Sequence, residues 1–160
     1  MHTTMRTLIV DDDPRFRQRV RELLDPEPAI IVVGEAVDGV DAIAKTRDLE
    51  PDLILLDIRM PGMNGLDAAR QLKAERPELK ILILSLYDLE EYHTIAQAYG
   101  LNGYIVKHSV FEELLPAIQG IEQACHLWNP GITSMRAMVS WIEDPLDIGE
   151  PDQDQARSGP

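Results

Sequence analysis

The chain has 160 residues and carries 28 Asp and Glu against 15 Lys and Arg, which gives a formal net charge of −13 at pH 7. This length suits one domain with a tail, and so acidic a balance argues against a surface built for nucleic acid or anionic lipid. The single cysteine, Cys125, allows no internal disulfide, and neither a signal sequence nor an apolar run of roughly 20 residues is present, so we expect a soluble cytoplasmic protein without a membrane segment.

The first third of the chain predicts two strands and two helices. Thr7–Val10 is a short β-type run that ends in three aspartates, and Pro14–Leu24 has helical apolar spacing with Asp13 as its N-cap. After two prolines, Ile30–Val33 predicts a second buried strand. Val40, Ile43 and Ala44 then mark a helix that runs to about residue 48.

The centre of the chain is Leu53–Leu56, four consecutive aliphatic residues that end at Asp57. Such an unbroken run suits a strand buried on both faces, as in the middle of a parallel sheet. A carboxylate at the carboxyl end of such a strand stands where open α/β sheets bind ligands. Taken alone, Asp57 could equally cap a turn.

Five more elements follow in alternation. They are a helix after Gly65 with Leu66, Ala69 and Leu72, a strand at Ile81–Leu84, a helix around Ile95 closed by Gly100, a strand at Tyr104–Val106 and a helix capped by Ser109. Five strands alternating with helices predict a doubly wound α/β fold. We therefore expect a flavodoxin-like, five-stranded parallel sheet of order 2-1-3-4-5 with helices on both faces.

Polar side chains follow four of the five predicted strands: Asp11 and Asp12 after the first, Asp57 after the third, Ser85 after the fourth and Lys107 after the fifth. In the expected order these four strands are neighbours, about 4.8 Å apart. The five side chains should therefore converge at one edge of the sheet, and five unrelated surface groups are the weaker interpretation.

This set of side chains points to phosphoryl chemistry. Three carboxylates repel one another, and Mg²⁺ is the plausible counter-charge because it takes oxygen ligands from one or two carboxylates and a phosphate. Lys107 supplies a point charge and Ser85 a hydroxyl for phosphoryl oxygens. A carboxylate nucleophile can itself accept the phosphoryl group.

Four segments resemble the receiver domain of bacterial two-component response regulators: LIVDDDP (8–14), LILLDIRMPGMNG (53–65), ILILS (81–85) and GYIVK (103–107). The resemblance extends from residue 6 to about residue 124, so we predict a receiver domain at 1–124. It implies that Asp57 is the phosphoacceptor, and that Ser85 and Lys107 hold the phosphoryl oxygens. It also implies that Asp12 binds Mg²⁺ directly, Asp11 largely through water and Arg59 through its backbone carbonyl.

Tyr104 matches the aromatic switch residue of that family. When the phosphoryl group arrives, the Ser85 hydroxyl would move toward it and Tyr104 would turn inward. This motion would change the face formed by the helix around Ile95, the strand at Tyr104–Val106 and the helix after Ser109. The alternative is a half-buried strand aromatic without special motion.

The segment 125–143 resembles the linker that precedes the DNA-binding domain in the helix-turn-helix (NarL/FixJ-like) subfamily. Its apolar stripe, Ile132, Met135, Val139 and Ile142, predicts an amphipathic helix that packs on its own domain or binds a partner. The acidic, Pro-rich segment 144–160 predicts a disordered tail, and no helix-turn-helix sequence follows.

Two function classes remain. The first is a receiver that a sensor histidine kinase phosphorylates and that signals through protein contacts, including phosphorylation-dependent self-association, without binding DNA itself. The second is the receiver half of a transcription regulator whose DNA-binding half is missing. A third, a phosphohydrolase, is disfavoured because Arg59 stands where such enzymes carry a second acid. We thus expect no enzyme activity beyond its own phosphorylation and dephosphorylation.

Overall fold

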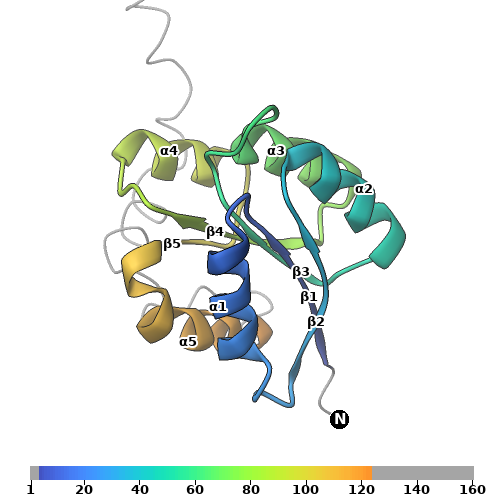
Figure 1. Ribbon diagram of the computed structural model, residues 1–160. Coiled ribbons are helices and arrows are strands. Elements are labelled where there is room, and N and C mark those ends of the chain that lie inside the picture. The colour runs from blue at the N-terminus through green and yellow to red at the C-terminus, as the bar shows by residue number, and fades with distance from the viewer. Residues whose placement is uncertain (1–3, 124–160) are drawn as a thin grey trace, which may run out of the picture.

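The computed structural model describes residues 4–123, over which strands and helices alternate (Figure 1). The strands are β1 (Met5–Val10), β2 (Ile30–Ala36), β3 (Leu53–Leu56), β4 (Lys80–Ser85) and β5 (Gly103–Val106). The helices are α1 (Pro14–Leu24), α2 (Gly39–Leu49), α3 (Gly65–Glu75), α4 (Glu90–Ala98) and α5 (Val110–Gln123), with a 3₁₀ turn, Lys107–Ser109, before α5. The segments predicted at 125–143 and 144–160 lie outside the described residues.

The strands form one parallel sheet in the order β2-β1-β3-β4-β5, which confirms the predicted doubly wound fold. Helices α1 and α5 cover one face of the sheet, and α2, α3 and α4 cover the other (Figure 1). Every crossover from one strand to the next therefore contains one helix. This connectivity brings the carboxyl ends of β1, β3, β4 and β5 to one edge of the sheet.

The central strand shows why its sequence is aliphatic throughout. Leu53 and Leu55 belong to the core under α1 and α5, whereas Ile54 and Leu56 belong to the core under α2, α3 and α4. All four side chains are fully buried because alternate residues of a strand point to opposite faces and both faces are covered. Burying four such side chains contributes roughly 1.5–3 kcal/mol each.

One prediction about burial was wrong. The second strand was expected to be buried, but β2 is the edge strand of the sheet and the side chain of Ile31 is 50% exposed. The helix predicted from Val40, Ile43 and Ala44 is present as α2, in which Ile43 is buried, Val40 is 62% exposed and Ala44 faces solvent. An apolar residue type alone does not show burial, because an edge strand has only one neighbouring strand.

The starts of α1 and α3 are fixed by capping side chains. The Asp13 carboxylate accepts a hydrogen bond from the Arg15 amide, as predicted, and the Asn64 side chain accepts one from the Leu66 amide. Both caps lie in loops at the carboxyl edge of the sheet, so they also fix the loops that carry the candidate site. Within residues 4–123 no helix is long and apolar enough to cross a membrane.

Candidate functional site

Three carboxylates and one lysine meet at the carboxyl edge of the sheet. Carboxylate oxygens of Asp11, Asp12 and Asp57 lie within 4.8 Å of one another, which is close enough to hold one metal ion. Lys107 Nζ lies 2.6 Å from Asp11 Oδ2 and 3.5 Å from Asp57 Oδ2. Asp11 and Asp57 are buried and Asp12 is exposed, so the cluster opens to solvent on one side.

Burial dominates the electrostatics of this cluster. It raises the pKa of Asp57 to about 6, with the charge of Asp11 acting in the same direction and Lys107 opposing it. Burial also raises the pKa of Asp11, although Lys107 lies in direct contact with that carboxylate. One lysine therefore does not compensate for two buried carboxylates, and an additional cation would be stabilised here.

The backbone around the cluster is shaped to hold it. The Ile58 amide donates to Asp57 Oδ1 at 2.9 Å, and the Asp13 amide donates to Asp11 Oδ1 at 2.8 Å. The first residue of α3, Gly65, passes so close that a Cβ there would stand 1.9 Å from the Asp57 carbonyl oxygen. A glycine is therefore required at the point where the loop after β3 enters its helix.

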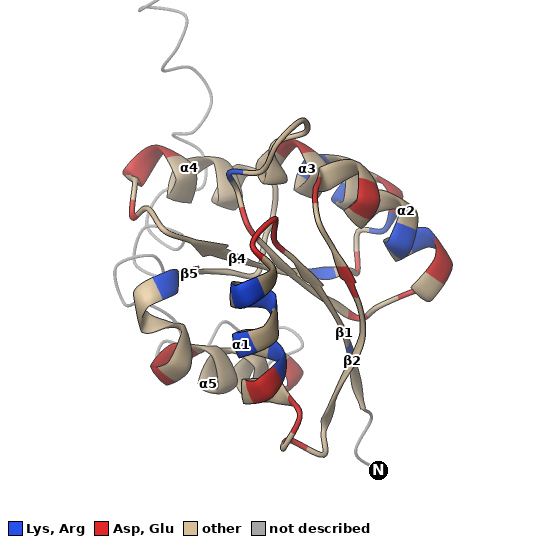
Figure 2. Cartoon of the chain, in the orientation of Figure 1, with Lys and Arg blue, Asp and Glu red and all other residues tan. Residues whose placement is uncertain are grey.

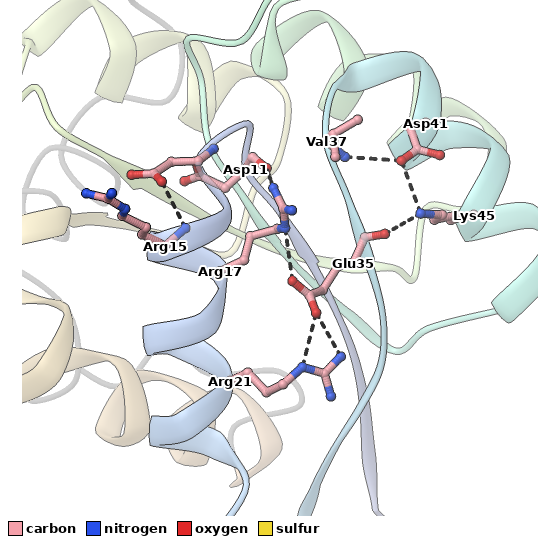
Figure 3. A network of polar contacts seen from close by, with 9 residues as sticks. Asp11, Arg15, Arg17, Arg21, Glu35, Val37, Asp41 and Lys45 are labelled. Carbon is pink, nitrogen blue, oxygen red and sulfur yellow. Dashed lines mark hydrogen bonds and ion pairs between the residues drawn. The ribbon is translucent and has the colours of Figure 1, made fainter.

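A second polar network fastens the loop that carries Asp11 (Figure 3). Arg17 donates from Nη1 to the Asp11 carbonyl oxygen at 2.5 Å and from Nε to Glu35 at 2.9 Å. Glu35 also pairs with Arg21 at 3.0 Å, and its carbonyl oxygen accepts from Lys45 at 2.5 Å. These contacts tie α1, β2 and α2 together beside the acidic loop, and Figure 2 shows that loop in red next to the blue segments of α1.

Ser85 and Tyr104 lie next to each other in the fold, on β4 and β5. Both side chains are buried, and the Ser85 hydroxyl accepts a hydrogen bond from the Tyr87 amide at 3.1 Å. The Tyr104 hydroxyl donates to the Tyr87 carbonyl oxygen at 2.5 Å. Burial raises the pKa of Tyr104 to about 12, while the Ser85 hydroxyl acts in the opposite direction. The ring is fully buried rather than half-buried, so it already has the inward position that the sequence prediction placed after phosphorylation.

Arg59 follows β3, and its side chain turns toward α4. Its Nε donates to the Tyr92 hydroxyl at 3.1 Å, and its guanidinium lies 4.2 Å from the centre of the Tyr87 ring. The hydrogen bond to Tyr92 raises the pKa of Arg59 further, so the side chain remains a cation. The predicted role of the Arg59 backbone carbonyl as a metal ligand stays a prediction.

Sequence reasoning missed two side chains at this edge. The centre of the Phe16 ring lies 4.4 Å from Lys107 Nζ, so the ring packs against the lysine. His93 is 4% exposed and contacts Tyr104. The sequence did contain one signal for His93. It lies three residues before Ala96, at helical spacing, and these two residues form the buried face of α4.

Comparison with known proteins gives a consistent result. The sequence profile described as the response regulator receiver domain matches residues 7–119. The nitrate/nitrite response regulator protein NarL of Escherichia coli K12 is 40% identical over 111 residues, which are 69% of this chain and 51% of that protein. The transcriptional regulatory protein DegU of Brevibacillus brevis is 36% identical over 126 residues, 79% of this chain and 53% of that protein. The chain spans about half the length of these curated relatives.

Solved structures are similar as well. A LuxR-family two-component response regulator from Aurantimonas superposes with a TM-score of 0.75 at 29% identity, over 88% of this chain and 96% of that one. The signal receiver domain of the putative response regulator NarL from Mycobacterium tuberculosis superposes with a TM-score of 0.71 at 31% identity, over 76% and 98% of the two chains.

Proposed function

Because the chain belongs to the response regulator receiver domain family, we propose that it accepts a phosphoryl group on Asp57 from a sensor histidine kinase in the cytoplasm. The observation that carries this proposal is the buried contact of Lys107 with both Asp11 and Asp57. In the reaction a bond forms between a carboxylate oxygen of Asp57 and phosphorus. The bond from phosphorus to the kinase's imidazole nitrogen breaks, and its electron pair stays on that nitrogen.

The two oxygens of Asp57 have different surroundings, and this difference suggests which one reacts. Oδ1 accepts the hydrogen bond from the Ile58 amide, which orients the carboxylate. Oδ2 faces Lys107 at 3.5 Å, so we assign the attack on phosphorus to Oδ2. Lys107 would then neutralise phosphoryl oxygens as a point charge, and the Ser85 hydroxyl would donate to one of them.

The donor set at this edge fits Mg²⁺, which prefers carboxylate and carbonyl oxygens. Asp11, Asp12, Asp57 and the Arg59 carbonyl would hold it. When bound, the ion would offset the charge of the acids and polarise the phosphoryl group. The chain's own residues then orient the nucleophile and carry the counter-charge.

Ser85 and Tyr104 would transmit phosphorylation at Asp57 to the surface of the domain. The ring of Tyr104 is buried, and its hydroxyl donates a hydrogen bond to the carbonyl oxygen of Tyr87, which is two residues after Ser85. A Ser85 hydroxyl drawn to the phosphoryl group would stabilise this buried arrangement, and with it one surface of α4, β5 and α5. The surface would signal through protein contacts, including contacts with a second copy of the chain.

Phosphorylation can be tested with the isolated protein. Incubation with acetyl phosphate and Mg²⁺ should add one phosphoryl group, detected by intact mass. The adduct should be absent in Asp57→Asn and in chelator, whereas Asp25→Asn, a change at an exposed acid at the end of α1, should leave it intact. An adduct that persists in Asp57→Asn contradicts the assignment.

Self-association tests the output. Sedimentation with and without a beryllofluoride phosphoryl mimic should give different mass distributions, and Tyr104→Ala should abolish the difference. Identical distributions at all concentrations would point to an output through other proteins only.

A second candidate function is the receiver part of a DNA-binding transcription regulator. It is favoured by the relatives themselves, since DegU is named a transcriptional regulatory protein and this chain spans about half of it. The complete gene separates the two, because a helix-turn-helix encoded in frame after residue 160 would favour the second function. In a gel shift at physiological salt the 160-residue chain itself should form no sequence-dependent complex, because its net charge is −13 and its densest group of Lys and Arg is the short run along residues 14–21. A sequence-dependent complex formed by this chain alone would contradict that expectation.

A further inference from the structure

His93 is a buried polar side chain that none of the roles above uses. It lies on α4 and is 4% exposed, together with Ala96 on the buried face of that helix. Histidine at such a position has an unpaired atom: Nδ1 is buried and has no hydrogen-bond partner among residues 4–123. An aliphatic residue would fill the position without that penalty, so the remaining contacts of His93 must offset it.

Those contacts reach both the switch tyrosine and the loop after β4. The His93 ring lies on the ring of Tyr104, with 3.9 Å between the centroids and an angle of 35° between the planes. Its other nitrogen, Nε2, is 2.6 Å from Asp88 Oδ1. In the neutral form this distance requires the proton on Nε2, which then donates to the carboxylate.

The stacked pair therefore holds two consecutive residues of one loop. Tyr104 donates to the Tyr87 carbonyl oxygen, and His93 contacts the Asp88 carboxylate. The amide of Tyr87 in turn donates to the Ser85 hydroxyl oxygen. The rings of His93 and Tyr104 thus fix the loop that directly follows Ser85, the last residue of β4.

We propose that His93 is a positioning residue: through its stacking on Tyr104 and its contact with Asp88, it keeps the tyrosine buried and the Ser85–Asp88 loop in place. It does not touch the phosphoryl group. Its action on phosphorylation runs through Ser85, and this part of the inference rests on the proposed function. The action on the loop does not depend on phosphorylation.

Three variants separate the contributions of His93. His93→Phe keeps a stacked ring and removes the contact with Asp88, and His93→Gln keeps a donor for Asp88 and removes the ring. Glu91→Gln is the matched control, because Glu91 lies on the same helix and faces solvent. Unfolding free energies from urea titrations show how far each variant is destabilised overall.

The first readout is hydrogen exchange of the Tyr87 amide without phosphoryl donor or divalent ion. In His93→Phe it should exchange about tenfold faster, the effect of losing one hydrogen bond that holds the loop. Amides of β1 and β3 should keep their rates, and Glu91→Gln should match wild type. His93→Gln should restore part of the protection. Unchanged exchange at Tyr87, or an equal acceleration at every amide, overturns the proposal.

The second readout is the affinity for beryllofluoride in the presence of Mg²⁺. It should fall several-fold in His93→Phe and stay unchanged in Glu91→Gln. Faster exchange at Tyr87 with wild-type affinity would overturn the link from His93 to the phosphoryl site. If wild-type protein fails to bind the mimic, the proposed function fails, and the exchange data alone still decide whether His93 positions the loop.

Discussion

Replacement of Asp57 by asparagine should stabilise the metal-free protein. Burial and the charge of Asp11 raise the pKa of Asp57 to about 6 from an ordinary value of 3.8, so the ionised carboxylate destabilises the folded state at neutral pH. A difference of about two pKa units corresponds to ~3 kcal/mol. The cluster is open to water at Asp12, which screens the charge, so we expect a gain of about 1–2 kcal/mol. In Asp57→Asn the amide oxygen of the new side chain can still accept a hydrogen bond from the Ile58 amide, and Lys107 still forms its ion pair with Asp11.

The assay is urea unfolding followed by circular dichroism at pH 7.5 in chelator. Asp57→Asn should unfold at higher urea than wild type with the same slope, whereas Asp12→Asn should shift the midpoint much less because Asp12 is exposed. Added Mg²⁺ should stabilise wild type more than Asp57→Asn. A lower midpoint for Asp57→Asn in chelator would refute the reasoning, because it would mean that Lys107 outweighs burial.

Three further predictions follow from the same edge of the sheet. Since the folded-state pKa of Asp57 is raised, its destabilising effect is full above about pH 6 and disappears as the pH falls toward 4, so the stability difference between Asp57→Asn and wild type should shrink over that range in urea titrations. Gly65→Ala should cost about 3 kcal/mol and slow phosphorylation, because the new Cβ would displace the Asp57 carbonyl; equal stability and rate would contradict this. Phosphorylated protein freed of donor should lose its phosphoryl group slowly. Arg59 is bound to Tyr92 and stacked on Tyr87, and neither Arg59 nor Tyr87 has an acid or amide group that could orient the attacking water. Arg59→Asn with Tyr87→Glu should accelerate the loss on a Phos-tag gel, and complete loss within seconds in wild type would show the idea wrong.

The sheet could be predicted because its strands are unusually plain in sequence. Leu53–Leu56 is aliphatic on both faces, and the spacing to the next strand leaves room for one helix each time. The buried face of α4 was less predictable. Ile95 and Ala98 predict the helix, and α4 is present there, with Ile95 half-buried against the core, Ala98 facing solvent and His93 on the buried face. Residue type could not indicate this face, because one of its two buried positions holds a polar side chain.

The acidic cluster could be predicted because strand ends are fixed by topology. Asp11, Asp57 and Lys107 each directly follow a strand, so the order of strands brings them together without knowledge of any side-chain conformation. The contacts of Arg17 with Glu35 and the Asp11 carbonyl could not be predicted in this way. They depend on how α1 lies across β2 and on the conformation of a long side chain, which no local pattern specifies.

The most direct test of the central claim is to identify the residue that carries the phosphoryl group. Protein phosphorylated by acetyl phosphate or by a histidine kinase is reduced with borohydride, which converts an aspartyl phosphate to homoserine, and the peptides are sequenced by mass spectrometry. The account predicts homoserine at position 57 alone. Homoserine at position 11 or 12, or a phosphoryl group found on a serine or histidine with position 57 unmodified, would contradict it.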